Sequence, residues 1–279
     1  MPPHGPQVAA ALAEAAFHGA ARDALPVLAV LDPAGPLPAR TRWLAGVCLG
    51  ALGRYRSAET WLRPGPDAAA PDSLALSCRA SHLRQLGRHA AAEPLDAAAL
   101  SAATDAEARA DALVGLVADA VGRLDRAAAR RRLAAARADL AAVDGGPRGD
   151  GGWRSAVRLA WVSAEVSLLC DDPSAAVAAA RAGWERSRAA TACRHAVKSQ
   201  LVLGAALEAA GRARPAARIL RAAAAGADRL DLPPLGWPAR ELLARIVEPR
   251  APVTAARERQ RADSAQSIIE YSADSRRNR

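Results

Sequence analysis

Two pairs of metal-ligating side chains stand close together in the sequence. Cys78 and His82 are four residues apart, which places them on one face of a helix, and Cys193 and His195 are two apart. A zinc site needs three or four ligands, and no second pair is recognisably placed to complete either set. The spacing therefore favours small buried thiols beside histidines. We expect no metal and no cofactor.

The residue patterns of common catalytic sites are missing as well. The segment DGGPRGDGG (144–152) has spaced glycines, but it follows a helix rather than a strand and lacks Gly-Lys-Ser/Thr, so it does not fit a phosphate-binding loop. The acidic pair Asp171-Asp172 precedes Pro173, which is typical of a capped helix start. Neither HExxH nor GxSxG occurs. We expect a protein that is not an enzyme.

Positive charge is the remaining chemical signal. The net charge is +9, and Lys198 is the only lysine. Abundant arginine and alanine indicate a GC-rich coding sequence of the actinobacterial type, which raises the charge without selection for phosphate binding. The densest basic stretch, residues 125–140, mixes arginines with leucines on one helical side, and no aromatic set interleaves with it. Nucleic acid is therefore the alternative partner rather than the leading one.

The composition points to helices. Hydrophobic residues make up 51% of the 279 residues, but aromatic residues only 3%. Alanine, leucine and arginine are strong helix formers, whereas strand-favouring residues are scarce. An all-α protein follows.

Glycine recurs at a fixed stride along the chain. Gly19, Gly53 and Gly87 are 34 residues apart, and an alanine stands five residues after each of the glycines in the series. A glycine between two apolar-periodic segments allows a tight turn, and small residues on either side let two helices cross closely. The small residues that precede the turns are Gly46, Ala80, Gly115 and Gly204. The turn glycines are Gly19, Gly53, Gly87, Gly122 and Gly211. The alanines that follow the turns are Ala24, Ala58, Ala92, Ala127 and Ala216.

This pattern resembles the tetratricopeptide repeat (TPR), a helical hairpin of 34 residues. The resemblance implies a right-handed superhelical solenoid of about six hairpins over residues 1–248, interrupted at 144–152 and closed by a C-terminal capping helix that starts near residue 234. The usual tyrosine of the first helix is replaced by Leu49, Leu83, Ala118 and Leu207. Residues 249–279 are rich in arginine and serine, which predicts a disordered basic tail. Its apolar island Ile268-Ile269-Glu270-Tyr271 is interpreted as a chance feature, with a docking motif as the alternative.

The resemblance also implies a binding groove on the concave face. Counting back from each turn glycine, the groove-lining residues are Arg40, Trp43, Ser81, Arg84, Gln85, Arg109, Asp119, Lys198 and Glu208. Four of them are basic, which would suit an acidic or extended peptide, although ordinary solvated helix faces explain them equally well. Trp153 and Trp161, eight residues apart, are expected in the core. The asparagines by which some family members hold chaperone tails are replaced by Val47, Ser81, Leu116 and Ala205.

The sequence therefore predicts a non-catalytic interaction scaffold that binds a protein or peptide in its groove, with the tail as a competitor for the same surface. A regulator that acts with the transcription apparatus or nucleic acid is the alternative. Residues 1–10 lack the pattern of a signal peptide, and no window is apolar enough to span a membrane, so we expect a cytoplasmic protein that does not enter a membrane. The oligomeric state stays open.

Overall fold

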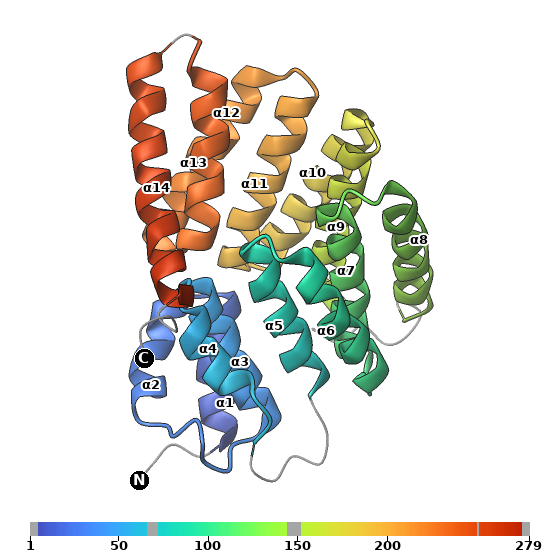
Figure 1. Ribbon diagram of the computed structural model, residues 1–279, viewed down its shortest axis with the longest axis vertical. Helices are drawn as coiled ribbons and strands as arrows, with labels where there is room; N and C mark the ends of the chain where they lie inside the picture. The colour runs from blue at the N-terminus through green and yellow to red at the C-terminus, as the bar shows by residue number, and fades with distance from the viewer. Residues whose placement is uncertain (1–4, 66–71, 144–151, 250, 275–279) are drawn as a thin grey trace.

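The described part of the chain, residues 5–65, 72–143, 152–249 and 251–274 of a computed structural model, consists of helices and turns without a strand (Figure 1). This confirms the all-α prediction. The elements are α1 (Gly5–Phe17), a short 3₁₀ helix η1 (Ala21–Ala24), α2 (Leu25–Ala29), α3 (Ala39–Ala51), α4 (Tyr55–Leu62), α5 (Ser73–Gln85), α6 (His89–Ala102), α7 (Ala106–Gly122), α8 (Arg126–Val143), α9 (Gly152–Leu169), α10 (Pro173–Ala189), α11 (Cys193–Ala209), α12 (Ala213–Leu230), α13 (Pro233–Val247) and α14 (Pro252–Asp274).

The helices stack as consecutive hairpins. Each odd-numbered helix from α3 onward packs against the even-numbered helix that follows it, and it also packs against the next odd-numbered helix. The odd-numbered helices, here called the inner helices, thus form one layer, and the even-numbered outer helices form a second layer around it. The predicted solenoid of helical hairpins is confirmed.

The two ends of this array meet. Helix α1 packs against α11, and α14 packs against α4, so that the end of α14 lies beside the first hairpins in Figure 1. Leu12, Trp43, Val197 and Leu243 belong to one buried apolar cluster that joins the first hairpins to the last ones. The interior of the array is therefore filled with its own side chains.

Residues with positive φ mark the turns inside the hairpins. Gly53, Gly87 and Gly211 have φ of +73°, +70° and +71°, a conformation that costs glycine little. The alanines five residues later, Ala58, Ala92 and Ala216, are fully buried. Gly46, Ala80 and Gly204 are buried in the preceding inner helices. Repeat one differs, because Gly19 has no positive φ, although Ala24 is buried.

The fourth hairpin lies two residues out of the predicted register. Leu124, not Gly122, adopts the left-handed conformation, with φ of 57°. The buried alanine of α8 is accordingly Ala129, whereas Ala127 is exposed. Gly122 is the last residue of α7, where a Cβ would overlap the ring of His89. The fifth turn uses Asp171 with φ of 60°, and Asp172 caps α10 by accepting a 2.9 Å hydrogen bond from the Ala175 amide.

The prediction of a disordered tail is wrong for Pro252–Asp274, which forms α14. This helix packs along α13 and thereby adds a seventh hairpin where a single capping helix was expected. Ile269 is 3% exposed, and its Cγ1 would come within 3.1 Å of a Cβ at Gly53, so it docks on the array. Arg259 and Glu248 join α14 to the end of α13 through two hydrogen bonds. The tail looked polar because its buried residues, Ala255, Ala262 and Ile269, are few and stand seven apart, on one face of the helix. Residues 144–151 and 275–279 lie outside the described residues.

Candidate functional site

Charged side chains gather in an otherwise apolar interior, all but one of them on inner helices. Four arginines and three aspartates make up what we call the interior cluster: Arg84 of α5, Asp96 of α6, Asp111 and Asp119 of α7, Arg154 and Arg158 of α9, and Arg194 of α11. The aspartates are at most 2% exposed. Charges are costly in such surroundings unless they are paired, so the pairing of each residue decides what the site can do.

Arg84 lies between two carboxylates. Its Nη1 pairs with Asp96 and donates a 3.1 Å hydrogen bond to Oδ1 of Asp119. Burial raises the pKa of Asp96 to about 7, against the opposing attraction of Arg84 and with repulsion from Asp119 adding to the rise. The pKa of Asp119 is raised as well, again by burial. One guanidinium thus holds two acids together in the wall between α5, α6 and α7.

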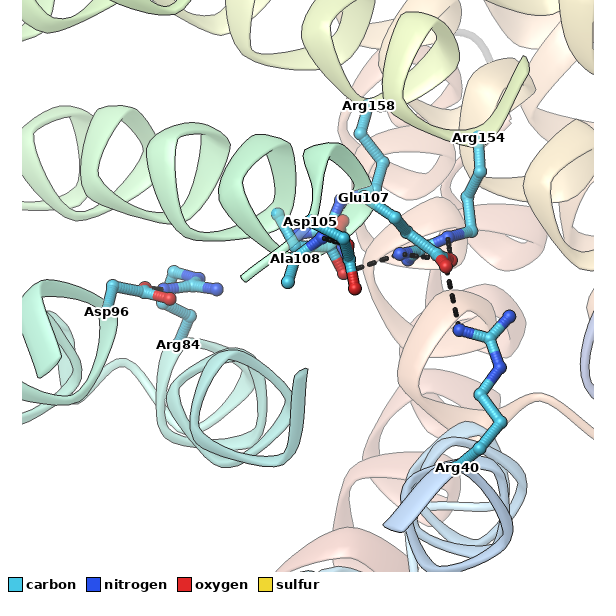
Figure 2. Close-up of polar contacts among 9 residues, drawn as sticks. Arg40, Arg84, Asp96, Asp105, Glu107, Ala108, Arg154 and Arg158 are labelled. Atoms are coloured by element: carbon cyan, nitrogen blue, oxygen red, sulfur yellow. Dashed lines mark hydrogen bonds and ion pairs between the residues drawn. The ribbon is translucent and has the colours of Figure 1, made fainter. Parts of the chain in front are cut away.

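A second chain of ion pairs crosses from α9 to α3 (Figure 2). Arg154 donates from Nη2 to Oδ2 of Asp111 at 2.7 Å and from Nε to Oε1 of Glu107 at 3.2 Å. Glu107 accepts a further 2.7 Å hydrogen bond from Arg40, and Arg158 lies 3.4 Å from Oδ1 of Asp111. Burial alone would raise the pKa of Asp111, but Arg154 and Arg158 more than offset it and hold that pKa below its usual range. Asp111 therefore stays ionised.

Arg194 differs from the other interior arginines because no described residue accepts a hydrogen bond or ion pair from it. Its Nε is shut off from solvent and has no partner among the described residues. Its charge acts on the buried thiols of Cys48 and Cys78, so it lies near α3 and α5. Burial lowers its pKa, against the opposing influence of Cys78 and Cys48, and the neighbouring Arg158 and Arg154 add to the lowering. A cation in this position is complementary to an added anion.

Aromatic rings cover one side of the cluster. The His195 ring stacks on Trp161 with centroids 5.3 Å apart and meets Trp153 edge-on at 4.9 Å. Phe17 from α1 lies 5.9 Å from both His195 and Trp43. Burial lowers the pKa of His195 well below its usual value, so the ring is neutral at pH 7. These contacts fix α1 on α9 and α11, and Trp153 and Trp161 serve the packing that the sequence predicted for them.

The arrangement of inner and outer helices is shared with a known structure. No protein-family model and no curated protein matches this chain. Among solved structures, the chain superposes on a Rap protein that was crystallised in complex with competence and sporulation factor, with a TM-score of 0.66 and 13% sequence identity. The match covers 96% of this chain and 78% of the Rap chain. The two proteins share a fold. The predicted TPR-like architecture is thereby confirmed, whereas such low identity carries no information on activity.

The structure brings four of the expected groove residues into the interior network and buries most of them. Trp43 is 1% exposed under the guanidinium of Arg40, 4.3 Å from its ring centre, and the Arg84 side chain is 10% exposed beside the buried Asp119. Of these four residues, only Arg40 remains exposed, at the edge of the network. An open groove lined by Trp43 and Arg84 is therefore absent from the described structure, because Phe17 of α1 packs against Trp43 and the side chains of Asp96 and Asp119 hold Arg84.

The other expected groove residues lie elsewhere. Arg109 pairs with Asp139 of α8 at 2.6 Å, away from the cluster, and Lys198 lies 3.6 Å from Glu165 and 6.0 Å from the Trp161 ring centre. Ser81 is half-buried, Gln85 and Glu208 are exposed, and none of these three makes a side-chain contact with the interior cluster. The expected set is thus divided rather than gathered in one groove.

Sequence reasoning missed Asp111, Arg158, Arg154 and Arg194, and a signal existed for the first two. Arg40 stands thirteen residues before the positive-φ residue of its hairpin, and the same count from Leu124 and Asp171 gives Asp111 and Arg158. Counting from the glycines missed them, because the left-handed residue of each of these two turns is not a glycine.

Other chemistry finds little support in the described ranges. Cys78 Sγ lies 3.6 Å from Nε2 of His82, but no group of three His, Cys, Asp or Glu side chains there could hold a metal ion. Burial raises the pKa of Cys78 to about 12 and lowers that of His82 to about 3, so both stay neutral near pH 7. Within those ranges no helix combines the length and hydropathy needed to cross a membrane.

Proposed function

We propose that this chain is a non-catalytic interaction scaffold that binds a carboxylate-bearing segment of a protein partner on its inner-helix face. The observation that carries the proposal is Arg194, a half-buried arginine whose Nε is shut off from solvent and which has no described carboxylate partner, while every other arginine of the interior cluster has one. A carboxylate from a partner would supply the missing charge and accept hydrogen bonds from the guanidinium fork.

Access to this face requires the array to open. The contacts of α1 with α11 and of α14 with α4 close the interior, and both join the first hairpins to the last ones. Binding would therefore separate the two ends, with the partner replacing contacts that the chain makes with itself. A fold shared with a Rap protein crystallised with a bound factor is consistent with a binding role for such an array.

Nucleic acid is less well supported as a partner. On α8, the helix with the densest basic stretch, Arg126 pairs with Asp171 at 2.7 Å, Arg130 donates to Cys170 Sγ at 3.1 Å, and Arg132 pairs with Glu93. The positive charge of this helix is thus partly used within the protein. Nucleic-acid binding would have to rest on the remaining exposed arginines and would weaken steeply with salt.

Selection from a random peptide library tests the proposal. The full chain should enrich peptides with aspartate, glutamate or a free terminal carboxylate, and Arg194→Gln should lose that enrichment. Arg212→Gln is the control, because Arg212 is exposed on a distant turn. Enrichment without acidic residues, or unchanged enrichment by Arg194→Gln, would contradict the assignment.

A further inference from the structure

A cavity of about 300 Å³ lies between α4, α5 and α6. Three arginines and one glutamate line it, together with three leucines, a tyrosine and a histidine: Arg56, Arg79, Arg88, Glu59, Leu83, Leu86, Leu95, Tyr55 and His82. Neither the interior cluster nor the proposed function uses its arginines.

The single acid of this cavity is already engaged. Glu59 accepts from Nε of Arg79 at 3.0 Å, and its other oxygen lies 2.9 Å from Arg79 Nη2, which is a bidentate pair. Arg63 approaches the same carboxylate at 3.9 Å. Arg56 and Arg88 are left without an acidic partner among the described residues. The cavity therefore carries two uncompensated positive charges.

The polar atoms of its wall are also unsatisfied. Nε and Nη2 of Arg56 and the hydroxyl of Tyr55 are buried and make no hydrogen bond to any described residue. Buried donors without acceptors are rare in folded proteins, because each costs free energy until it is satisfied. Three such donors beside one cavity point to an acceptor that the cavity takes up.

From these observations we infer that the cavity binds a phosphate monoester. The phosphate would accept from the guanidinium of Arg56 and the hydroxyl of Tyr55, with Arg88 at the rim. A phosphate monoester carries nearly two negative charges at pH 7 and so matches the two free arginines, whereas a carboxylate would match only one. Its organic group would lie on the leucines and on the stacked rings of Tyr55 and His82, whose centroids are 4.8 Å apart.

Titration calorimetry on the full chain tests the site with phenyl phosphate, inorganic phosphate and benzoate. Phenyl phosphate should bind saturably and more tightly than either of the others, since only it has both the dianion and the ring. Arg56→Gln and Arg88→Gln should each weaken it about tenfold or more, the usual effect of removing a charge-assisted hydrogen bond. Circular dichroism checks that the variants are folded. If Arg56→Gln is not folded, the binding of phenyl phosphate by Arg88→Gln decides the test, because Arg88 is exposed.

The matched control is Arg212→Gln. Arg212 follows Gly211 and precedes α12 just as Arg88 follows Gly87 and precedes α6, but it does not line the cavity. Arg212→Gln should bind phenyl phosphate like the wild type. No saturable binding, benzoate binding as tightly as phenyl phosphate, or an equal loss in Arg212→Gln would overturn the inference.

A phosphotyrosine peptide distinguishes the two sources of this group. Tighter binding of the peptide than of phenyl phosphate assigns the site to a phosphorylated protein side chain. Equal or weaker binding assigns it to a small molecule.

Discussion

Replacing Arg154 with methionine should destabilise the protein far more than the same change at Arg40, although both arginines pair with Glu107. Arg154 and Asp111 have side chains 6% and 3% exposed, whereas Arg40 and Glu107 are 46% and 29% exposed. Breaking a buried pair strands the remaining charge, at a typical cost of about 3–5 kcal/mol. Breaking an exposed pair costs about 0–1 kcal/mol.

Two local features set the expected value for Arg154→Met near the lower end. Arg158 stays 3.4 Å from Asp111 and compensates part of its charge. Methionine also preserves contact with the Phe17 and Trp43 rings, over which the guanidinium lies at 5.9 Å and 5.1 Å from their centres. We therefore expect a loss of about 3 kcal/mol for Arg154→Met and of under about 1 kcal/mol for Arg40→Met at pH 7.

Urea unfolding followed by circular dichroism measures both losses, with pH as an internal check. Without Arg154, burial should raise the pKa of Asp111 above its value in the unfolded chain. The penalty should then be small below the unfolded pKa and grow as the pH rises towards 7. A loss of less than about 1 kcal/mol for Arg154→Met, or equal losses for the two variants, would refute the claim that the interior pairing is energetically significant.

Three further predictions concern the core. Because burial lowers the pKa of His82 from 6.5 to about 3, the unfolded chain binds a proton that the folded chain does not, so stability falls as the pH drops below 6.5. His82→Phe should remove up to about 3 kcal/mol of that loss by pH 4 in urea titrations, and an unchanged pH slope would contradict the assignment. Cys48 and Cys78 are buried, and burial raises the pKa of each thiol to about 12, so with an aromatic disulfide reagent they should react much more slowly than the half-buried Cys170 and Cys193; four equally fast thiols would show otherwise. Gly204→Ala should cost about 1–3 kcal/mol, since its Cβ would meet Leu220 Cδ2 at 2.5 Å, while Gly152→Ala, with open space around it, should not destabilise.

Local features of the fold could be predicted from the sequence, and long-range ones could not. The hairpins are visible because a turn glycine such as Gly53 and a crossing alanine such as Ala58 are needed at each repeat. In the fourth and fifth hairpins the left-handed conformation is adopted by Leu124 and Asp171. Neither residue type indicates this conformation in a sequence. The glycine spacing therefore assigns the fourth turn to Gly122, two residues before Leu124.

The candidate site depended on facts that the sequence does not contain. Trp43 and Arg84 were correctly placed on the inner helices, but their burial follows from contacts with other helices. Phe17 and Arg154 lie against Trp43, and Asp96 and Asp119 hold Arg84. Arg194 is one arginine among many in the sequence. Only its position near α3 and α5, and the pairing of the other interior arginines, make it distinctive.

Unfolding of Arg194→Met tests the account most directly. If Arg194 is kept for a partner and is unpaired in the free protein, methionine should retain the packing of its stem, remove a poorly compensated charge and raise the free energy of unfolding, by about 1 kcal/mol or more. An arginine held by structural pairing would give the reverse. A stabilised Arg194→Met that no longer selects acidic peptides is the predicted result, and a variant destabilised by more than about 1 kcal/mol would contradict it.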